Sequence, residues 1–127
     1  MPANMQTVEI KAFVPARDLE QSKRFYRDLG FEIPWSSDDL AYLHAGDCSF
    51  LLRSLDDEAH AASFMMHLLV ADVDAWWRHV EEQGLRERYG VRAEPPADRP
   101  WRIRDFVLAD PSGVTWRIGT NLGGPHA

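Results

Sequence analysis

The sequence predicts an α+β fold in which a single domain of 127 residues contains two tandem βαβββ modules. Two amphipathic helix patterns occur, and the aspartates that can cap them, Asp18 and Asp72, stand 54 residues apart. The glycines that can end them, Gly30 and Gly84, are separated by the same 54 residues. Each helix pattern follows one strand pattern and precedes three others, so the two halves of the chain repeat one topology.

The first module opens with an alternating run, because the apolar side chains at positions 8, 10, 12 and 14 share one face of a strand. The helix pattern then begins at Asp18, where Gln21 completes a capping box, and ends at Gly30. Three strand patterns follow at residues 31–35, 40–44 and 48–53. The pair Gly46-Asp47 predicts a hairpin between the last two.

The second module opens with an apolar strand pattern at residues 64–70, before the helix that Asp72 can cap. Its other strands are predicted at residues 85–91, 101–108 and 114–119, with a break at Pro95-Pro96 and a turn at residues 110–113. We therefore expect modules at about residues 7–55 and 62–120, connected by the charged, alanine-rich residues 56–63. Residues 121–127 are expected to form a mobile tail.

Composition narrows the class of protein. Twenty acidic and fourteen basic side chains give a net charge of −6, which disfavours general nucleic-acid binding. Cys48, the one cysteine, excludes an intrachain disulfide or a multi-thiolate metal site, and a chain without disulfides suits a reducing compartment. No apolar run reaches the ~20 residues of a membrane span, and the first seven residues lack a signal-peptide pattern. We expect a cytoplasmic protein that has no membrane or nucleic-acid partner.

Short motifs occur in a fixed order along this repeat. They are Val14-Pro-Ala-Arg-Asp-Leu19, Phe25-Tyr26, Leu29-Gly30-Phe31, Val73-Asp74, Arg99-Pro-Trp-Arg-Ile-Arg-Asp-Phe106 and Asp110-Pro-Ser-Gly113. In this order the chain resembles the glyoxalase / bleomycin resistance protein / dioxygenase superfamily, also called vicinal oxygen chelate proteins. The resemblance covers about residues 8–120, and the Pro-Trp pair before the Asp-Pro-x-Gly turn is most similar to the bleomycin-resistance branch.

The resemblance implies curled mixed sheets that enclose a cavity, helices packed outside them, and a homodimer in which a strand or a module can be exchanged. In metal-dependent members four strand positions bind a divalent ion, and the repeat places these positions at Lys11, Phe50, Met65 and Arg117. Lys and Arg are normally protonated, and Phe has no ligand atom. A hard divalent ion requires oxygen or imidazole ligands. We therefore expect neither a metal nor another cofactor.

The same four positions are candidates for binding a small molecule. Lys11 and Arg117 could hold an anionic or carbonyl group of a ligand, or they could pair with carboxylates such as Glu9. Met65 and Phe50 would suit an apolar, adaptable wall, although methionine also fills gaps in cores.

Four further side chains are candidates for binding the small molecule. Trp101 follows Pro100 at the start of a strand pattern, and by resemblance the matching tryptophan of bleomycin-binding relatives lines the drug cleft. Trp35 follows Pro34 at an analogous place in the first module. His67 is either a pH-sensitive hydrogen-bonding group or a core histidine. Arg104 either faces the cavity mouth or belongs to a solvated basic stretch.

The remaining tryptophans divide by strand and helix position. Trp116 is expected in the core, because alternation places it opposite Arg117. Trp76 and Trp77 cannot both face inward from one helix, so one should pack on the sheet while the other lies at a dimer contact or in solvent.

We expect a metal-free protein that sequesters a drug-like or aromatic ligand in a dimer cleft without turnover. The alternative is a glyoxalase- or dioxygenase-like enzyme whose metal is bound by another set, such as His67, Glu9 and His44. A third hypothesis is a metal-free lyase or isomerase with Lys11 or His67 as acid or base.

Overall fold

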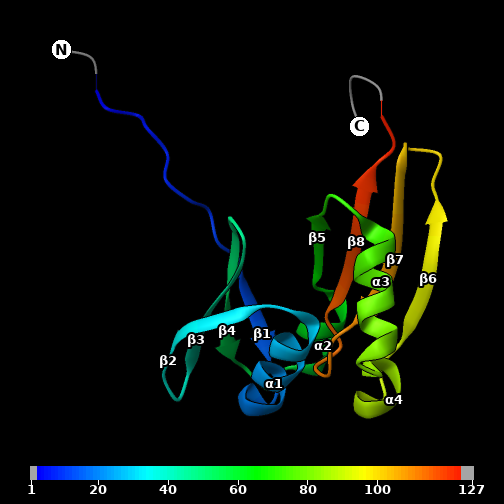
Figure 1. The fold of residues 1–127 in the computed structure, drawn as a ribbon. Coiled ribbons are helices and arrows are strands. Elements are labelled where there is room, and N and C mark those ends of the chain that lie inside the picture. The colour runs from blue at the N-terminus through cyan, green and yellow to red at the C-terminus, as the bar shows by residue number, and fades with distance from the viewer. Residues whose placement is uncertain (1–2, 124–127) are drawn as a thin grey trace.

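Two four-stranded mixed sheets form the framework of the protein in the computed structural model, which describes residues 3–123 (Figure 1). The first sheet has the order β1 (Phe13–Ala16), β4 (Cys48–Ser54), β3 (Leu40–Ala45) and β2 (Glu32–Ser36). The second has the order β5 (Met65–Leu69), β8 (Thr115–Asn121), β7 (Ile103–Ala109) and β6 (Ala93–Asp98). β1 is parallel to β4, and β5 is parallel to β8, whereas the other pairs are antiparallel.

This repeated order confirms the predicted α+β fold with two βαβββ modules. Six of the predicted strands lie within two residues of their observed bounds. The two sheets remain separate, however, so within one chain they do not close around a cavity. None of the helices among residues 3–123 is long and apolar enough to cross a membrane.

The two main helices begin and end at the residues that the repeat predicts. α1 (Leu19–Leu29) is capped by Asp18, which accepts a hydrogen bond from the backbone N–H of Gln21 at 3.2 Å. α3 (Val73–Glu82) is capped in the same way by Asp72. Gly30 ends α1 with φ 126°, a conformation that only glycine adopts without strain. In Figure 1, α3 covers one face of the second sheet.

The strand predicted at residues 85–91 is wrong, because the chain forms a short helix there, α4 (Leu85–Tyr89). Gly84 and Gly90 flank it with φ of 61° and 63°, so the chain turns sharply at both ends and cannot run on as a strand. The strand appears later, as β6, and it contains the Pro95-Pro96 pair that was interpreted as a break. β6 is an edge strand whose register shifts between Glu94 and Ala97, and edges and irregular registers tolerate proline.

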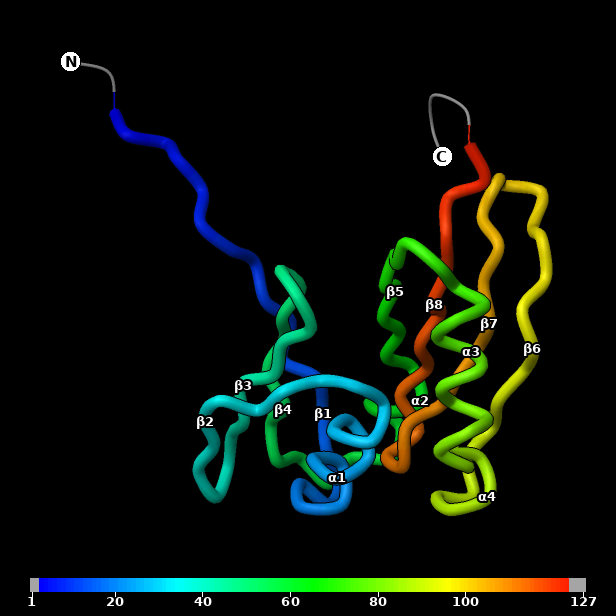
Figure 2. Tube along the Cα trace, in the orientation of Figure 1, coloured from blue at the N-terminus to red at the C-terminus, as the bar shows by residue number. Residues whose placement is uncertain are grey.

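Two other segments differ from the prediction. Residues 56–63, expected to be a plain connection, include the helix α2 (Glu58–Ser63), capped by Asp57. The strand predicted at residues 8–14 is reduced to Phe13–Ala16, and the preceding residues extend away from the body of the molecule (Figure 2). Val8 and Ile10 are 96% and 94% exposed, because no strand among residues 3–123 pairs with them.

The module boundaries stay a prediction, and so does the tail. Of the seven residues assigned to the tail, Asn121 is the last residue of β8, and residues 124–127 lie outside the described part of the chain.

An aromatic cluster joins the two modules. Tyr26 of α1, Phe31 and Phe50 of the first module pack against Trp116 of β8, with the ring centres of Phe50 and Trp116 5.2 Å apart. Trp116 is only 2% exposed, which confirms that it belongs to the core. The cluster therefore makes the packing of each module depend on the other.

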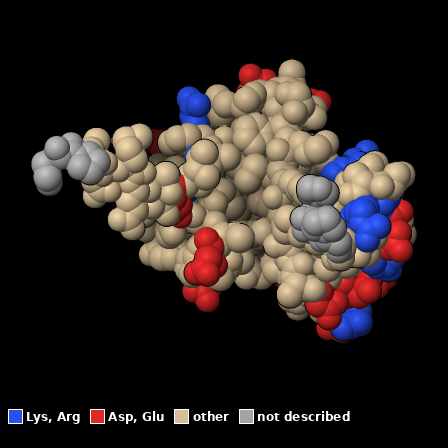
Figure 3. All heavy atoms as spheres, turned by 90° about the horizontal axis from the view of Figure 1, so that it is seen from above, with Lys and Arg blue, Asp and Glu red and all other residues tan. Residues whose placement is uncertain are grey.

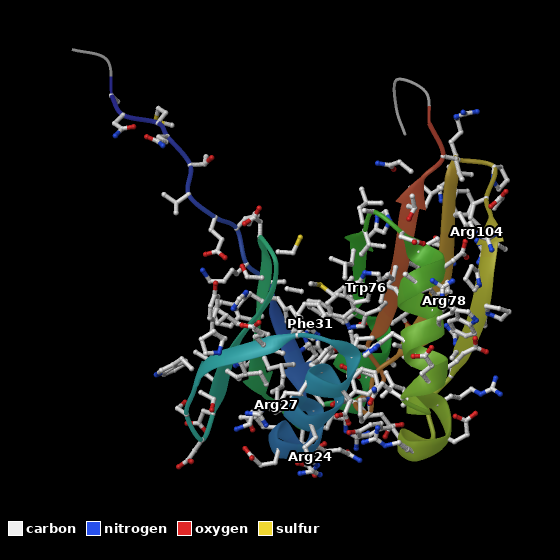
Figure 4. All side chains as sticks on the ribbon, viewed as in Figure 1. Arg24, Arg27, Phe31, Trp76, Arg78 and Arg104 are labelled. Carbon is white, nitrogen blue, oxygen red and sulfur yellow. The ribbon has the colours of Figure 1, made fainter. Side chains whose placement is uncertain are left out.

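The two neighbouring tryptophans of α3 both pack within the chain. Trp77 lies against Phe106 of the second sheet, with ring centres 5.1 Å apart. Trp76 points toward Phe31 of the first module, with ring centres 6.4 Å apart (Figure 4). Both tryptophans are partly buried against the core, so both face inward from α3, whereas a dimer contact of either remains a prediction.

A buried hydrogen-bond network crosses the same boundary. The Tyr26 hydroxyl donates to Asp110 Oδ2 at 2.5 Å and accepts from Trp116 Nε1 at 2.7 Å. Asp110 Oδ1 accepts the backbone N–H groups of Ser112 and Val114, both at 2.9 Å. Burial raises the pKa of Tyr26 well above its ordinary value, so the hydroxyl remains a donor. α1 is thereby fixed to the turn between β7 and β8.

Candidate functional site

Each sheet has one face that packs on the core and one that does not, and we call the latter the first and second open faces. In β4, Phe50 and Leu52 are buried, so alternation places Ser49 and Leu51 on the first open face. In β8, Trp116 and Ile118 are buried, which places Arg117 on the second. Seen from above, residues other than Lys, Arg, Asp and Glu occupy the middle of the molecule, and the largest group of charged side chains lies at one edge (Figure 3).

The first open face is aromatic. Phe13 of β1 and Tyr42 of β3 are the two cross-strand neighbours of Leu51, and Trp35 of β2 is paired with Tyr42. The side chains of Phe13 and Trp35 are more than half exposed. This face thus offers flat apolar surface to a ligand or to another chain. Phe13 and Tyr42 were not among the candidates, because only the strand pairing shows that they share a face with Trp35.

Lys11 lies at the border of this face and is paired with a carboxylate. Its Nζ is 2.6 Å from Glu9 Oε1 and 5.6 Å from the ring centre of Tyr42. Ser49 donates a second hydrogen bond to Glu9. The hydrogen bond from Lys11 lowers the pKa of Glu9. Of the two interpretations of Lys11, the structure shows the ion pair.

The second open face carries charge. Arg117 is the cross-strand neighbour of His67 of β5, and Met65 lies two residues earlier on the same side of that strand. Asp105 of β7 is 1% exposed and accepts hydrogen bonds from Arg99 Nε at 2.8 Å and from Arg117 Nη1 at 3.2 Å. Met65 is more than half exposed. The sequence did not predict Arg99 and Asp105 as site residues, because both belong to a charged stretch that is typical of a solvated surface.

A glycine makes room for this ion cluster. A Cβ at Gly119 would lie 2.8 Å from Asp105 Cβ and 2.8 Å from the carbonyl oxygen of Arg104, closer than side-chain atoms approach. Gly119 is paired with Asp105 across β8 and β7. Glycine at this position therefore allows Asp105 to sit beside Arg117.

A hollow of about 320 Å³ lies between the beginning of β4 and β5. Ser49 and His67 line its sides, whereas Phe31, Phe50 and Trp116 of the aromatic cluster form its base. The sequence predicted Phe50 beside the other ligand-facing positions. It is instead 1% exposed, so it lies on the core face and supports the hollow from beneath.

The misplacement of Phe50 has a geometric cause. The position was predicted as four residues after a turn glycine, Gly46 in the first module and Gly113 in the second. Ala45 pairs directly with Cys48 in the first hairpin, whereas Ala109 pairs with Thr115 in the second. Cys48 and Thr115 both lie two residues after the glycine, but Cys48 shares the core face of β4 with Phe50, whereas Thr115 shares the open face of β8 with Arg117.

Of the two alternatives for Arg104, the structure shows a side chain paired with carboxylates and not one at a cavity mouth. Its guanidinium pairs with Asp74 of α3 at 3.1 Å and with Asp98 at 3.2 Å, and Figure 4 shows it beside α3. Because α3 packs on the core face of the second sheet, Arg104 is directed toward the helix and away from the open face. Trp101 is more than half exposed in the β6–β7 turn, where its neighbour Arg102 has φ 66° and donates to the carbonyl of Gly123.

The residues at the four superfamily metal positions do not fit a metal ion. Lys11 and Arg117 are cations already paired with carboxylates, Phe50 is in the core, and Met65 offers only a thioether. Among residues 3–123, no three His, Cys, Asp or Glu side chains form a group that could hold a metal ion. The alternative set is also dispersed, since Glu9 pairs with Lys11, His44 pairs with Glu32 at 3.4 Å, and His67 lies on the other sheet.

Comparisons with known proteins agree with this architecture. The model of the Glyoxalase/Bleomycin resistance protein/Dioxygenase superfamily matches residues 8–118. A crystal structure of a bleomycin-binding protein complexed with bleomycin is 25% identical, with a TM-score of 0.79, over 91% of this chain and 99% of that one. A bleomycin resistance determinant encoded on the transposon Tn5 is also 25% identical, with a TM-score of 0.80, over 91% of this chain and 98% of that one.

An enzyme of the same fold is also similar. Lactoylglutathione lyase from Agrobacterium tumefaciens is 18% identical, with a TM-score of 0.68, over 92% of this chain and 96% of that one. No curated protein sequence matches the chain.

Proposed function

Because the chain belongs to the glyoxalase/bleomycin resistance protein/dioxygenase superfamily, we propose that it is a metal-free small-molecule binding protein of the bleomycin-resistance type. One observation carries the proposal. The open faces present exposed aromatic and aliphatic side chains, including Trp35 and Met65, together with the paired cations Lys11 and Arg117. Such surfaces bind flat apolar molecules by stacking and burial.

The relatives support the type of ligand. The match to this chain covers 99% of the bleomycin-binding protein, and the structure of that protein contains bleomycin. We propose a drug-like or aromatic small molecule as the ligand class here. Trp101 and Trp35 are the proposed stacking surfaces, because each is an exposed indole at the border of its module. A cytoplasmic location remains a prediction.

We expect Trp101→Ala and Trp35→Ala to weaken ligand binding by about tenfold each, since exposed tryptophans at binding sites often contribute more than 1 kcal/mol. Isothermal titration calorimetry with bleomycin as the first probe, followed by a panel of planar antibiotics, would measure this effect. His60→Ala on α2 is the control that should leave binding unchanged. Absence of binding across the panel would contradict the proposal. Stoichiometric Ni, Zn, Fe or Mn in freshly purified protein would favour the enzyme alternative.

We also propose that the ligand lies in a cleft formed by two copies of the chain. Among residues 3–123 the two sheets do not join, and apolar side chains remain exposed on both open faces. The extended N-terminal segment adds Met5, Val8 and Ile10, each more than four-fifths exposed. A second copy of the chain is the partner that we propose for these surfaces. Its open face would complete the cleft, and its contact would bury the extended N-terminal segment.

Val8→Asp and, separately, Ile10→Asp are therefore expected to weaken self-association by about tenfold or more, because a charge without a partner is costly to bury. Thr7→Asp introduces the same charge on the opposite side of the extended segment, so it is the matched control. Light scattering over a concentration series measures the dissociation of each variant. A monomeric native protein at micromolar concentration, or equal effects of all three substitutions, would disprove the dimer cleft.

A further inference from the structure

The second open face contains one carboxylate placed between two guanidinium groups. Asp105 accepts from Arg99 at 2.8 Å and from Arg117 at 3.2 Å and 3.3 Å. Two positive charges and one negative charge leave this cluster formally cationic. Asp105 is almost completely buried, whereas about a third of the Arg117 side chain and a quarter of the Arg99 side chain are exposed. The carboxylate thus lies beneath the surface, and the cations form the part that a ligand would meet.

Arg117 is held in place with donors to spare. Among the described residues it donates only through Nη1, so Nη2 and Nε remain for a second partner. Its anchoring by Asp105 and its place in β8 reduce the entropy that a flexible side chain would lose on binding. A planar guanidinium with free N–H groups matches a carboxylate or similar anion. His67, its cross-strand neighbour, is exposed beside it and offers a further ring N–H.

The other charges near this face do not neutralise the cluster. In the described part of the chain, strand register places one further carboxylate on this side, that of Glu94 on the edge strand β6, and it pairs with Arg92 at 3.4 Å. Asp74 and Asp98 are paired with Arg104. The net charge of −6 acts at long range, where salt screens it within about 8 Å, whereas Arg117 acts at contact.

We propose that the second open face is the site for the anionic group of a planar aromatic acid, bound by Arg117 with His67 beside it. This inference rests on the proposed function and names its ligand class. In the two-chain cleft, the aromatic first open face, with Trp35, Tyr42 and Phe13, would contact the ring of the same ligand. The site then prefers an aromatic anion to a neutral or cationic molecule of equal shape.

Three naphthyl probes of matched shape test this preference: naphthoate, naphthylmethanol and naphthylmethylammonium. Calorimetry on the native protein should show naphthoate binding at least about tenfold more tightly than the neutral probe, as a charge-assisted hydrogen bond predicts. Arg117→Gln should remove this difference by weakening naphthoate alone. Asp105 keeps Arg99 as a partner in that variant, so folding should be preserved. Arg86→Gln, an exposed arginine on α4, is the matched control and should change nothing.

The outcomes separate the two proposals. If no naphthyl probe or drug-like ligand binds, the proposed function fails. If the probes bind but naphthoate has no advantage over naphthylmethanol or naphthylmethylammonium in the native protein, the inference is overturned while the proposed function stands. A naphthoate preference that persists in Arg117→Gln would also overturn it, because the anion would then bind elsewhere.

Discussion

Replacing Trp116 by alanine is expected to lower the free energy of unfolding by about 3–5 kcal/mol, the range for removing a large aromatic side chain from a core. Trp116 is 2% exposed and contacts Tyr26, Phe31 and Phe50, which all belong to the first module. The substitution would leave a cavity at the boundary between the modules. It would also remove the indole N–H that donates to the Tyr26 hydroxyl.

Urea denaturation followed by circular dichroism would measure this loss. Trp35→Ala is the matched control, because that indole is more than half exposed and its removal should change stability by no more than about 0.5 kcal/mol. Trp116→Phe retains part of the buried surface and should cost less, so it remains informative if Trp116→Ala does not fold. Equal effects of Trp116→Ala and Trp35→Ala would show that the aromatic cluster does not join the modules.

The repeat predicted the fold well because its signals are local. Asp18 and Asp72 cap their helices through contacts within one turn, and the spacing of these caps fixes the equivalence of the modules. The errors occur where tertiary context decides. Residues 85–91 have apolar side chains that suit a strand, but Gly84 and Gly90 adopt left-handed conformations. Residues 8–11 belong to the strand predicted at residues 8–14, but none of the described strands pairs with them.

The candidate site was predicted in part, for a related reason. Alternation within a strand places Met65 and His67 on one face of β5, and Trp116 and Arg117 on opposite faces of β8, because it needs no knowledge of distant residues. Phe50 was predicted by counting four residues from a turn glycine, and the count fails because the first paired residue after the turn lies on the core face in β4 and on the open face in β8. The partner of Arg117 could not be predicted, since Asp105 becomes an ion-pair partner only through the pairing of β7 with β8.

Asp110→Ala is the other substitution with a large expected effect, because three buried donors lose their acceptor. These are the Tyr26 hydroxyl and the backbone N–H groups of Ser112 and Val114. Each buried donor without a partner costs about 1–3 kcal/mol, so the loss should be at least about 3 kcal/mol. Asp110→Asn keeps an oxygen for the two backbone N–H groups and should cost less. Urea denaturation at neutral pH would show this order, and equal stabilities of the two variants would contradict it.

A comparison of the native protein with Asp110→Asn should also show a pH dependence of the free energy of unfolding, with a defined sign. Burial raises the pKa of Asp110 above its ordinary value of 3.8, although hydrogen bonds from Tyr26 and the turn oppose this shift. The folded state therefore binds this proton more tightly than the unfolded state, and stability falls as pH rises from about 3.8 through the folded pKa. Asp110→Asn cannot titrate. The stability of the native protein relative to Asp110→Asn should therefore decrease with rising pH over that window, while the other carboxylates cancel in the difference. A difference that grows with pH would mean that the hydrogen bonds to the carboxylate outweigh its burial.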